Sequence, residues 1–177
     1  MFNIFNKRVD SMIIRKKELK DCEAWIDVNI KSWNENLKGV VSDKLLKFIR
    51  DKRDSRIQNA TDNFVSDDWH YVLEENGKVI GILKLKESDK KGYEKCGEVQ
   101  VLYLYTEEKG KGYGKALINK AFEVLKSKGY KKAVIGCVDG NPSNGFYKHL
   151  GGKFVRQDPW DILDEHYMEN IYEYDLI

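Results

Sequence analysis

A segment between residues 98 and 116 combines glycines and lysines where a strand meets a helix. Residues 98–105 are apolar and aromatic, as in a buried strand, and from Gly112 apolar residues recur at helical spacing. Three glycines alternate with three lysines and a tyrosine at the junction, namely Gly110, Gly112 and Gly114 with Lys109, Lys111, Lys115 and Tyr113. A helix N-terminus carries unpaired N–H groups and the positive end of the helix dipole, and glycines let a bulky anion approach them. The segment therefore predicts a site for a phosphate or pyrophosphate group.

Two familiar phosphate-binding motifs do not fit this segment. A dinucleotide-binding G-x-G-x-x-G that starts at Gly110 needs a glycine at position 115, where the chain has Lys115. A P-loop that ends at Gly114 and Lys115 needs a glycine at position 109 and Ser or Thr at position 116. The chain has Lys109 and Ala116 there instead. The pattern that remains is x-x-x-G-x-G.

A second segment, residues 141–152, reads NPSNGFYKHLGG. Together the two segments resemble the signature of the GCN5-related N-acetyltransferases (GNAT), small bacterial members in particular. In that family Gln or Arg, two variable residues and Gly-x-Gly or Gly-x-Ala stand at a strand-to-helix junction. An Asn after the fifth strand then precedes a helix with Phe-Tyr-x-x-Leu-Gly. Lys109 stands here where the family has Gln or Arg, and the resemblance covers almost the whole chain from Met12.

The resemblance implies that acetyl-CoA is the co-substrate and that no metal is needed. It implies that the cofactor lies between two strands that splay apart, where its pantetheine amides pair with the strand backbone. Asn141 would then hydrogen-bond the pantetheine arm, and Tyr147 would lie near the thioester sulfur. The cofactor-binding residues implied are Leu102, Tyr103, Leu104, Lys109, Gly110, Lys111, Gly112, Tyr113, Gly114, Lys115, Asn141 and Tyr147.

Acetyl transfer to an amine needs a base, an oxyanion donor and an acid. The amine attacks only when it is neutral, so a carboxylate must accept its proton, and Glu98 at the start of the cofactor strand is the candidate. A backbone N–H within residues 102–104 could stabilise the oxyanion, and Tyr147 could protonate the departing thiolate. Each residue also has a structural interpretation: Glu98 as a surface carboxylate that ends a loop, Tyr147 as a packing aromatic and Asn141 as a turn residue.

The acceptor side of the site is expected in two loops, over residues 33–41 and 157–170. The first begins with a Ser-Trp-x-x-x-x-x-Gly pattern that resembles many small bacterial acetyltransferases. The second is acidic and aromatic. The candidate substrate residues are Trp33, Asp158, Trp160 and Asp161. Carboxylates with aromatics would attract a cationic amine, such as a polyamine, an aminoglycoside or a peptide amine, but a solvated acidic loop explains them slightly better.

The strands and helices that position these residues are predicted from the hydrophobic periodicity of the sequence. Strands are predicted over residues 12–15, 69–73, 79–85, 98–105, 132–138, 153–156 and 171–176. Helices are predicted over 20–33, 42–49, 112–129 and 144–150, and residues 51–66 form a weak helix or a loop. Ser42 is a candidate N-cap, and Asn76-Gly77 predicts a hairpin turn. The order β-α-α-β-β-β-α-β-α-β-β predicts an α/β (α+β) fold, which by resemblance is a mixed, mostly antiparallel sheet with helices on both faces.

Length and composition fit one globular domain. The chain has 177 residues, and we assign 12–177 to a single acetyltransferase domain and 1–11 to a short N-terminal extension. A net charge of +2 gives no reason to expect nucleic acid as a partner. No segment has the length of a transmembrane helix, so no membrane partner is expected. Three widely spaced cysteines without zinc spacing predict reduced thiols in the cytoplasm.

The sequence leaves two classes of function open. The first is an N-acetyltransferase that transfers an acetyl group from acetyl-CoA to a primary amine of a small molecule or peptide, by direct attack in a ternary complex. The second is a non-catalytic acyl-CoA-binding or regulatory module with the same fold. The presence of both Glu98 and Tyr147 favours the enzyme. The acceptor and the acyl chain length stay open, as does the choice between a monomer and the homodimer that is common among small acetyltransferases.

Overall fold

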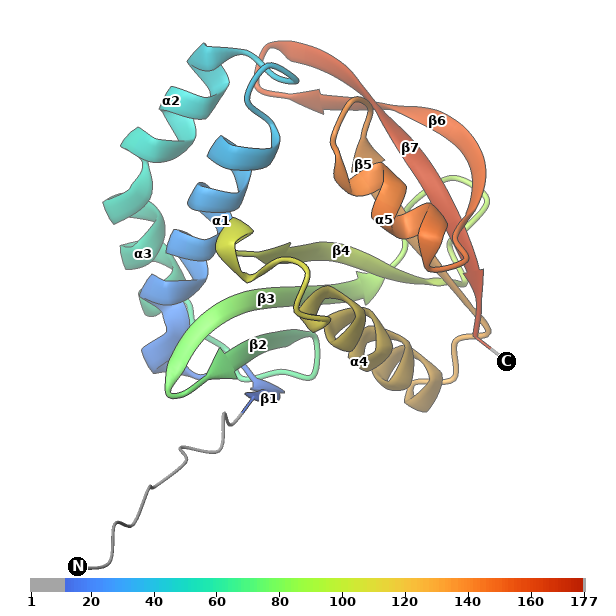
Figure 1. Ribbon diagram of the computed structural model, residues 1–177, viewed down its shortest axis with the longest axis horizontal. Coiled ribbons are helices and arrows are strands. Elements are labelled where there is room, and N and C mark those ends of the chain that lie inside the picture. The colour runs from blue at the N-terminus through green and yellow to red at the C-terminus, as the bar shows by residue number, and fades with distance from the viewer. Residues whose placement is uncertain (1–11, 177) are drawn as a thin grey trace, which may run out of the picture.

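The computed structural model describes residues 12–176, which form a seven-stranded sheet with helices on both faces (Figure 1). The strands are β1 (Met12–Lys16), β2 (His70–Glu75), β3 (Lys78–Glu87), β4 (Gly97–Leu104), β5 (Lys132–Val138), β6 (Lys153–Ile162) and β7 (Glu165–Asp175). The helices are α1 (Cys22–Asn36), α2 (Asp43–Asp51), α3 (Arg53–Asp62), α4 (Tyr113–Ser127) and α5 (Ser143–His149), with 3₁₀ turns η1 (Leu19–Asp21) and η2 (Thr106–Glu108).

The strands follow the order β1-β2-β3-β4-β5-β7-β6, and β4 and β5 are its one parallel pair within residues 12–176. Between these two described strands, pairing extends only from Gly97 opposite Ala133 to Val99 opposite Ile135. Beyond these pairs β4 and β5 separate, as Figure 1 shows. The β3–β4 register also shifts here, so that Gln100 has no Cα partner on β3. This splay is the feature that the resemblance implied.

Alternating strand residues build cores on the two faces of the sheet. On one face Ile82 of β3 packs with Val28 of α1, and on the other Leu83 packs with Leu117 and Leu125 of α4. Figure 1 shows α1, α2 and α3 on one side of the sheet and α4 with α5 on the other. The two sets of helices fix the sheet from both sides, so that the splayed ends of β4 and β5 open between them.

The structure differs from the sequence prediction in the last two strands. The stretch 157–170 is not a loop, because β6 and β7 form a long antiparallel hairpin that pairs from Lys153 opposite Glu173 to Ile162 opposite Glu165. Only residues 163–164 connect the two strands. Acidic residues are weak strand formers, and this stretch contains many of them. Their presence obscured the alternating strand pattern, which the cross-strand pairs stabilise.

The polar stretch that the sequence left as a weak helix or a loop contains α3. No residue of α3 is buried, so the apolar periodicity that marks a helix is missing from it. Its first residue, Arg53, instead binds two carboxylates of α1, with 2.6 Å from Nε to Oδ1 of Asp27 and 2.8 Å from Nη2 to Oε1 of Glu23. Contacts with a neighbouring helix therefore stabilise α3.

Candidate active site

The turn before α4 has the open backbone that an anion site requires. Gly110 and Gly112 have φ angles of 81° and 85°, and Gly112 is the N-cap of α4. A Cβ at either glycine would meet nothing within 4 Å. No side chain within residues 12–176 caps the first N–H groups of this 15-residue helix. These N–H groups therefore remain available to an external acceptor at the positive end of the helix dipole.

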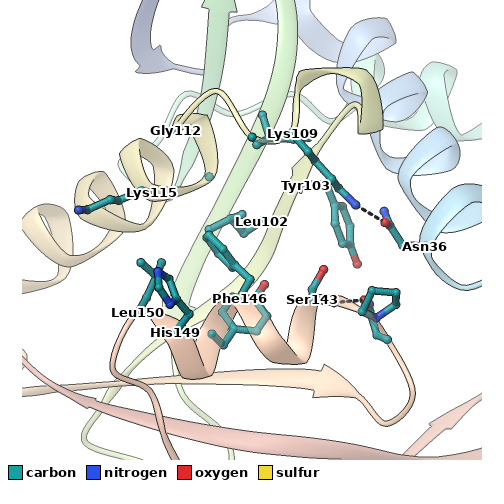
Figure 2. Close-up of a pocket in the computed structure, with 16 residues that line it drawn as sticks. Asn36, Leu102, Tyr103, Lys109, Gly112, Lys115, Ser143, Phe146, His149 and Leu150 are labelled. Atoms are coloured by element: carbon teal, nitrogen blue, oxygen red, sulfur yellow. Dashed lines mark hydrogen bonds between the residues drawn. The ribbon is translucent and has the colours of Figure 1, made fainter.

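A large cavity of about 580 Å³ lies between this turn, β4 and α5 (Figure 2). Ten of the twelve residues expected to bind the cofactor line it: Leu102, Tyr103, Leu104, Lys109, Gly110, Gly112, Gly114, Lys115, Asn141 and Tyr147. The other two, Lys111 and Tyr113, do not line it. The Lys111 ammonium lies 2.6 Å from a carboxylate oxygen of Glu108, and the Tyr113 hydroxyl bonds Glu75 on β2.

Lys109 and Asn36 both line the large cavity. The Lys109 ammonium donates to the amide oxygen of Asn36 at the end of α1, and Figure 2 shows the two side chains meeting. Lys115 extends away from Lys109 along α4 in the same view. Two cations therefore lie on opposite sides of Gly112, where negative phosphate charge would be stabilised.

A small cavity of about 250 Å³ adjoins the large one at the splay. Five residues line both cavities: Leu102, Tyr103, Asn141, Ser143 and Tyr147. They come from β4, from α5 and from the turn before α5. A ligand in the large cavity and a second ligand in the small cavity would therefore meet beside these residues.

Glu98 lies on the wall of the small cavity and is only 5% exposed. Its Oε2 atom has no hydrogen-bond partner in the part of the chain described. Two ammonium groups lie near the carboxylate, that of Lys86 at 3.7 Å and that of Lys90 at 3.8 Å. Burial raises the pKa of Glu98 in spite of these cations, because desolvation disfavours the charged form. The buried carboxylate therefore holds a proton more readily than an exposed one, as a general base must.

Tyr147 and Asn141 stand where the two cavities meet. Tyr147 is 6% exposed, and its hydroxyl has no hydrogen-bond partner among the described residues. Burial raises the pKa of Tyr147 well above its ordinary value of 10, so the phenol stays protonated at neutral pH. The side-chain oxygen of Asn141 accepts from the N–H of Ser143 at 2.8 Å, which fits its structural role in the turn. Its amide N–H₂ has no partner within residues 12–176 and can still donate to a ligand.

The structure brings two of the four candidate substrate residues to the small cavity. Trp33 and Trp160 line it, with ring centroids 5.7 Å apart. Asp158 and Asp161 do not line it. Asp158 binds Arg156, with 2.6 Å between Oδ1 and Nε, and this contact lowers the pKa of the carboxyl. Oδ1 of Asp161 lies 2.8 Å from Nδ1 of His166.

Sequence reasoning missed four charged residues of the small cavity, namely Lys86, Asp89, Lys90 and Glu169. Lys90 comes from the connection between β3 and β4, and Glu169 comes from β7. The one signal for Glu169 was Gly136, a glycine inside a strand, which often marks the close approach of another group.

Within the described chain no cluster of three or more His, Cys, Asp or Glu side chains is suited to a metal ion. No helix there combines the length and apolar character that a membrane crossing requires.

The family model of the acetyltransferase (GNAT) family matches residues 40–151, more than half of the chain. The chain belongs to the GNAT family of acetyltransferases. Across 156 residues it is 28% identical to YuaI of Bacillus subtilis (strain 168), an uncharacterized N-acetyltransferase, with 84% of each chain covered. The family resemblance of the two sequence motifs is thus confirmed.

Solved GNAT structures have the same fold. The PaiA N-acetyltransferase of Thermoplasma acidophilum, in complex with coenzyme A, superimposes with a TM-score of 0.67 at 23% identity, covering 93% of this chain and 99% of that one. YncA of Salmonella typhimurium, solved with its cofactor acetyl-CoA, gives a TM-score of 0.62 at 20% identity with 95% of both chains covered. The predicted mixed, mostly antiparallel sheet with helices on both faces is confirmed.

Proposed function

We propose that this GNAT protein transfers an acetyl group from acetyl-CoA to a primary amine of a small molecule or peptide. The observation that carries the proposal is the junction of the two cavities beside Tyr147, with the buried carboxylate of Glu98 in the small one. One cavity offers an anion site and the other a proton acceptor. An amine and a thioester bound side by side there would react directly in a ternary complex.

The residues of the large cavity fit acetyl-CoA. The uncapped N–H groups at Gly112 and the flanking lysines suit its pyrophosphate, and the unpaired edge of β4 beyond Val99 suits its pantetheine amides. The amide N–H₂ of Asn141 can bind a pantetheine carbonyl. Bound acetyl-CoA supplies an activated thioester carbonyl. The family members solved with coenzyme A and acetyl-CoA support this choice of donor.

The chain's own residues would carry the proton transfers. Glu98 accepts the proton of the attacking amine, directly or through water. A backbone N–H of residues 102–104 stabilises the developing oxyanion, and the protonated phenol of Tyr147 donates to the departing thiolate. All three cysteines are free and buried, which fits a reducing compartment, and we place the enzyme in the cytoplasm.

A thiol-release assay tests the proposal. Purified protein and acetyl-CoA are mixed with polyamines, aminoglycosides, amino acids and short peptides in turn, and free CoA is measured. The expected result is turnover with one class of amine. Calorimetry with acetyl-CoA separates the alternatives: binding without turnover by any amine would favour the acyl-CoA-binding module, and no binding would contradict both.

Alanine at Gly112 is expected to weaken acetyl-CoA binding about tenfold, since an L-residue in this left-handed conformation costs about 1–2 kcal/mol and shifts the N–H groups that bind phosphate. The matched control is Gly129→Ala at the other end of α4. Gly129 has a φ of 91° and equally open space around it, so its replacement costs similar stability. Calorimetry should show weakened binding in the first variant only. Equal affinities in both would remove the turn from the cofactor site.

Cys137 lines the small cavity, yet it is not expected to form an acetyl-enzyme. Burial raises the pKa of its thiol to about 12, so the nucleophilic thiolate is almost absent at neutral pH. Cys137→Ala should keep kcat within about tenfold, whereas loss of a covalent nucleophile costs about 10⁶. Mass spectrometry after mixing wild-type protein with acetyl-CoA alone should show no acetylated Cys137. An accumulated thioester on this residue would contradict direct transfer.

A further inference from the structure

Glu169 reaches the small cavity because β5 has a glycine beneath it. Glu169 lies opposite Val138 in the β5–β7 ladder, and its side chain turns over the neighbouring Gly136. A Cβ on Gly136 would stand 2.0 Å from Oε2 of Glu169, so the carboxylate could not keep this position beside any side chain there. The missing side chain thus lets a carboxylate of β7 cross β5 towards the splay. The Glu169 side chain is 13% exposed.

Lys90 places an ammonium group between the buried carboxylate of Glu98 and the partly buried carboxylate of Glu169. It forms an ion pair with Glu169, and its Nζ is 3.8 Å from Oε1 of Glu98. The Lys90 side chain is 13% exposed, and its backbone N–H donates to the hydroxyl of buried Ser88 at 3.2 Å. The lysine is therefore held by a local turn in the β3–β4 connection, while its ammonium faces carboxylates of β4 and β7.

This arrangement leaves hydrogen-bonding capacity unused. The ammonium of Lys86, the other cation on this wall, lies 2.7 Å from Oδ2 of Asp89. It lies 3.7 Å from Oε2 of Glu98, which is too far for a hydrogen bond. Oε2 of Glu98 accepts no hydrogen bond from the described residues, although the group is almost fully buried. An ammonium group has three N–H donors, so one seated deeper than that of Lys90 could donate to Glu98 and Glu169 together.

We propose that Glu98 and Glu169 form the binding site for the ammonium group of the acceptor, and that Lys90 occupies this site until the acceptor displaces it. The inference rests on the proposed function and names its substrate class, a primary alkylammonium. The acceptor binds in its charged form, gives one proton to Glu98 and attacks as the neutral amine. As the tetrahedral intermediate collapses, Tyr147 protonates the departing CoA thiolate and regains its proton from the acceptor nitrogen, which leaves the neutral amide and CoA. The released Lys90 ammonium turns to solvent, where hydration replaces its ion pairs.

The test uses Lys90→Ala, which removes the Lys90 ammonium from both carboxylates and leaves Lys86 in place. The probe is ethylammonium chloride at about 50 mM, with sodium chloride at equal ionic strength as the control. Ethylammonium is expected to raise the Tm of Lys90→Ala about 3 °C more than sodium chloride does. Wild-type protein, in which Lys90 fills the site, and Lys90→Ala with Glu169→Gln should respond equally to both salts.

A neutral variant guards against a folding failure. Lys90→Gln keeps two of the four methylenes and an uncharged N–H donor, and its Tm should also respond more to ethylammonium than to sodium chloride. Equal responses to the two salts in both single variants would overturn the inference. An ethylammonium effect that persists after Glu169→Gln would overturn the role of Glu169.

Two further readouts separate this inference from the proposed function. With acetyl-CoA and ethylamine, Lys90→Ala should release CoA at least about tenfold faster than wild type at subsaturating amine, and added Glu169→Gln should abolish the gain. Stabilisation by ethylammonium without CoA release, in protein that binds acetyl-CoA, would show a cation site that is not the acceptor site. Acetyl-CoA binding without any ethylammonium effect overturns the inference alone. No acetyl-CoA binding, with the ethylammonium effect intact, overturns the proposed function and leaves the cation site without an acceptor role.

Discussion

Glu98→Gln is expected to lower kcat/KM for the acceptor about 10²–10⁴-fold, the usual contribution of a general base, and to leave the affinity for acetyl-CoA unchanged. Glutamine keeps the size of the side chain but cannot take a proton from the amine. Because burial raises the pKa of Glu98, the acidic limb of the wild-type pH profile should lie above the ordinary range of a glutamate. Steady-state kinetics across pH measure both effects. An unchanged acidic limb in the variant would assign the base to another group.

The same substitution should not destabilise the protein at neutral pH. The folded-state pKa of Glu98 is raised above the unfolded value of about 4.3, so the native state binds the proton more tightly than the unfolded state does. Ionised Glu98 therefore costs stability once the pH rises through this range, and glutamine removes that cost. Urea unfolding should show Glu98→Gln at least as stable as wild type at neutral pH, with the advantage lost below about pH 4. A base that lowers stability while it serves catalysis is a common trade-off.

Tyr147→Phe is expected to lower kcat about 10²-fold, because the leaving thiolate loses its proton donor. The affinity for acetyl-CoA should change little, since the ring and its packing remain. Stability should also change little, because the hydroxyl has no hydrogen-bond partner within residues 12–176 that the substitution would leave unpaired. Single-turnover and steady-state rates, with thermal unfolding alongside, give the three values.

The matched control for this variant is Tyr103→Phe. Tyr103 lines both cavities as well, and burial raises the pKa of its phenol to about 12. Its hydroxyl, however, accepts a hydrogen bond from Nε1 of Trp33 at 3.1 Å, which gives it a structural partner. Tyr103→Phe should therefore reduce kcat less than tenfold. A larger loss in Tyr103→Phe than in Tyr147→Phe would transfer the role of proton donor to Tyr103.

Local signals in the sequence were enough to locate most elements. The N-cap at Ser42 is confirmed by its hydroxyl, which accepts from the N–H of Leu45 at 3.0 Å. The Asn76-Gly77 turn is confirmed by positive φ angles of 51° and 82°. The glycine-rich turn precedes a helix that begins at Tyr113, one residue after the predicted start at Gly112. Each of these features depends on residues that are close in the sequence, so a local pattern is enough to predict it.

Features that depend on distant partners could not be predicted in this way. Arg53 marks the start of α3 only once α1 supplies its carboxylates. The β6–β7 hairpin is set by cross-strand pairing rather than by propensity. The place of Glu169 follows from the β5–β7 register, which no local pattern encodes, and the sequence prediction assigned it to an acidic loop instead.

The short contact between β4 and β5 also has a mechanical meaning. In the described sheet, strands β1 to β4 form one part and strands β5 to β7 the other, and we call these two parts leaves. Three residue pairs between β4 and β5 join them. The free edges beyond Val99 and Ile135 leave the two leaves without a shared backbone ladder over half of the seam. A bound pantetheine arm would act as a temporary strand in that seam. The protein would then change from two weakly coupled leaves into one continuous sheet, so that exchange of backbone amides in both leaves would slow together when the ligand binds.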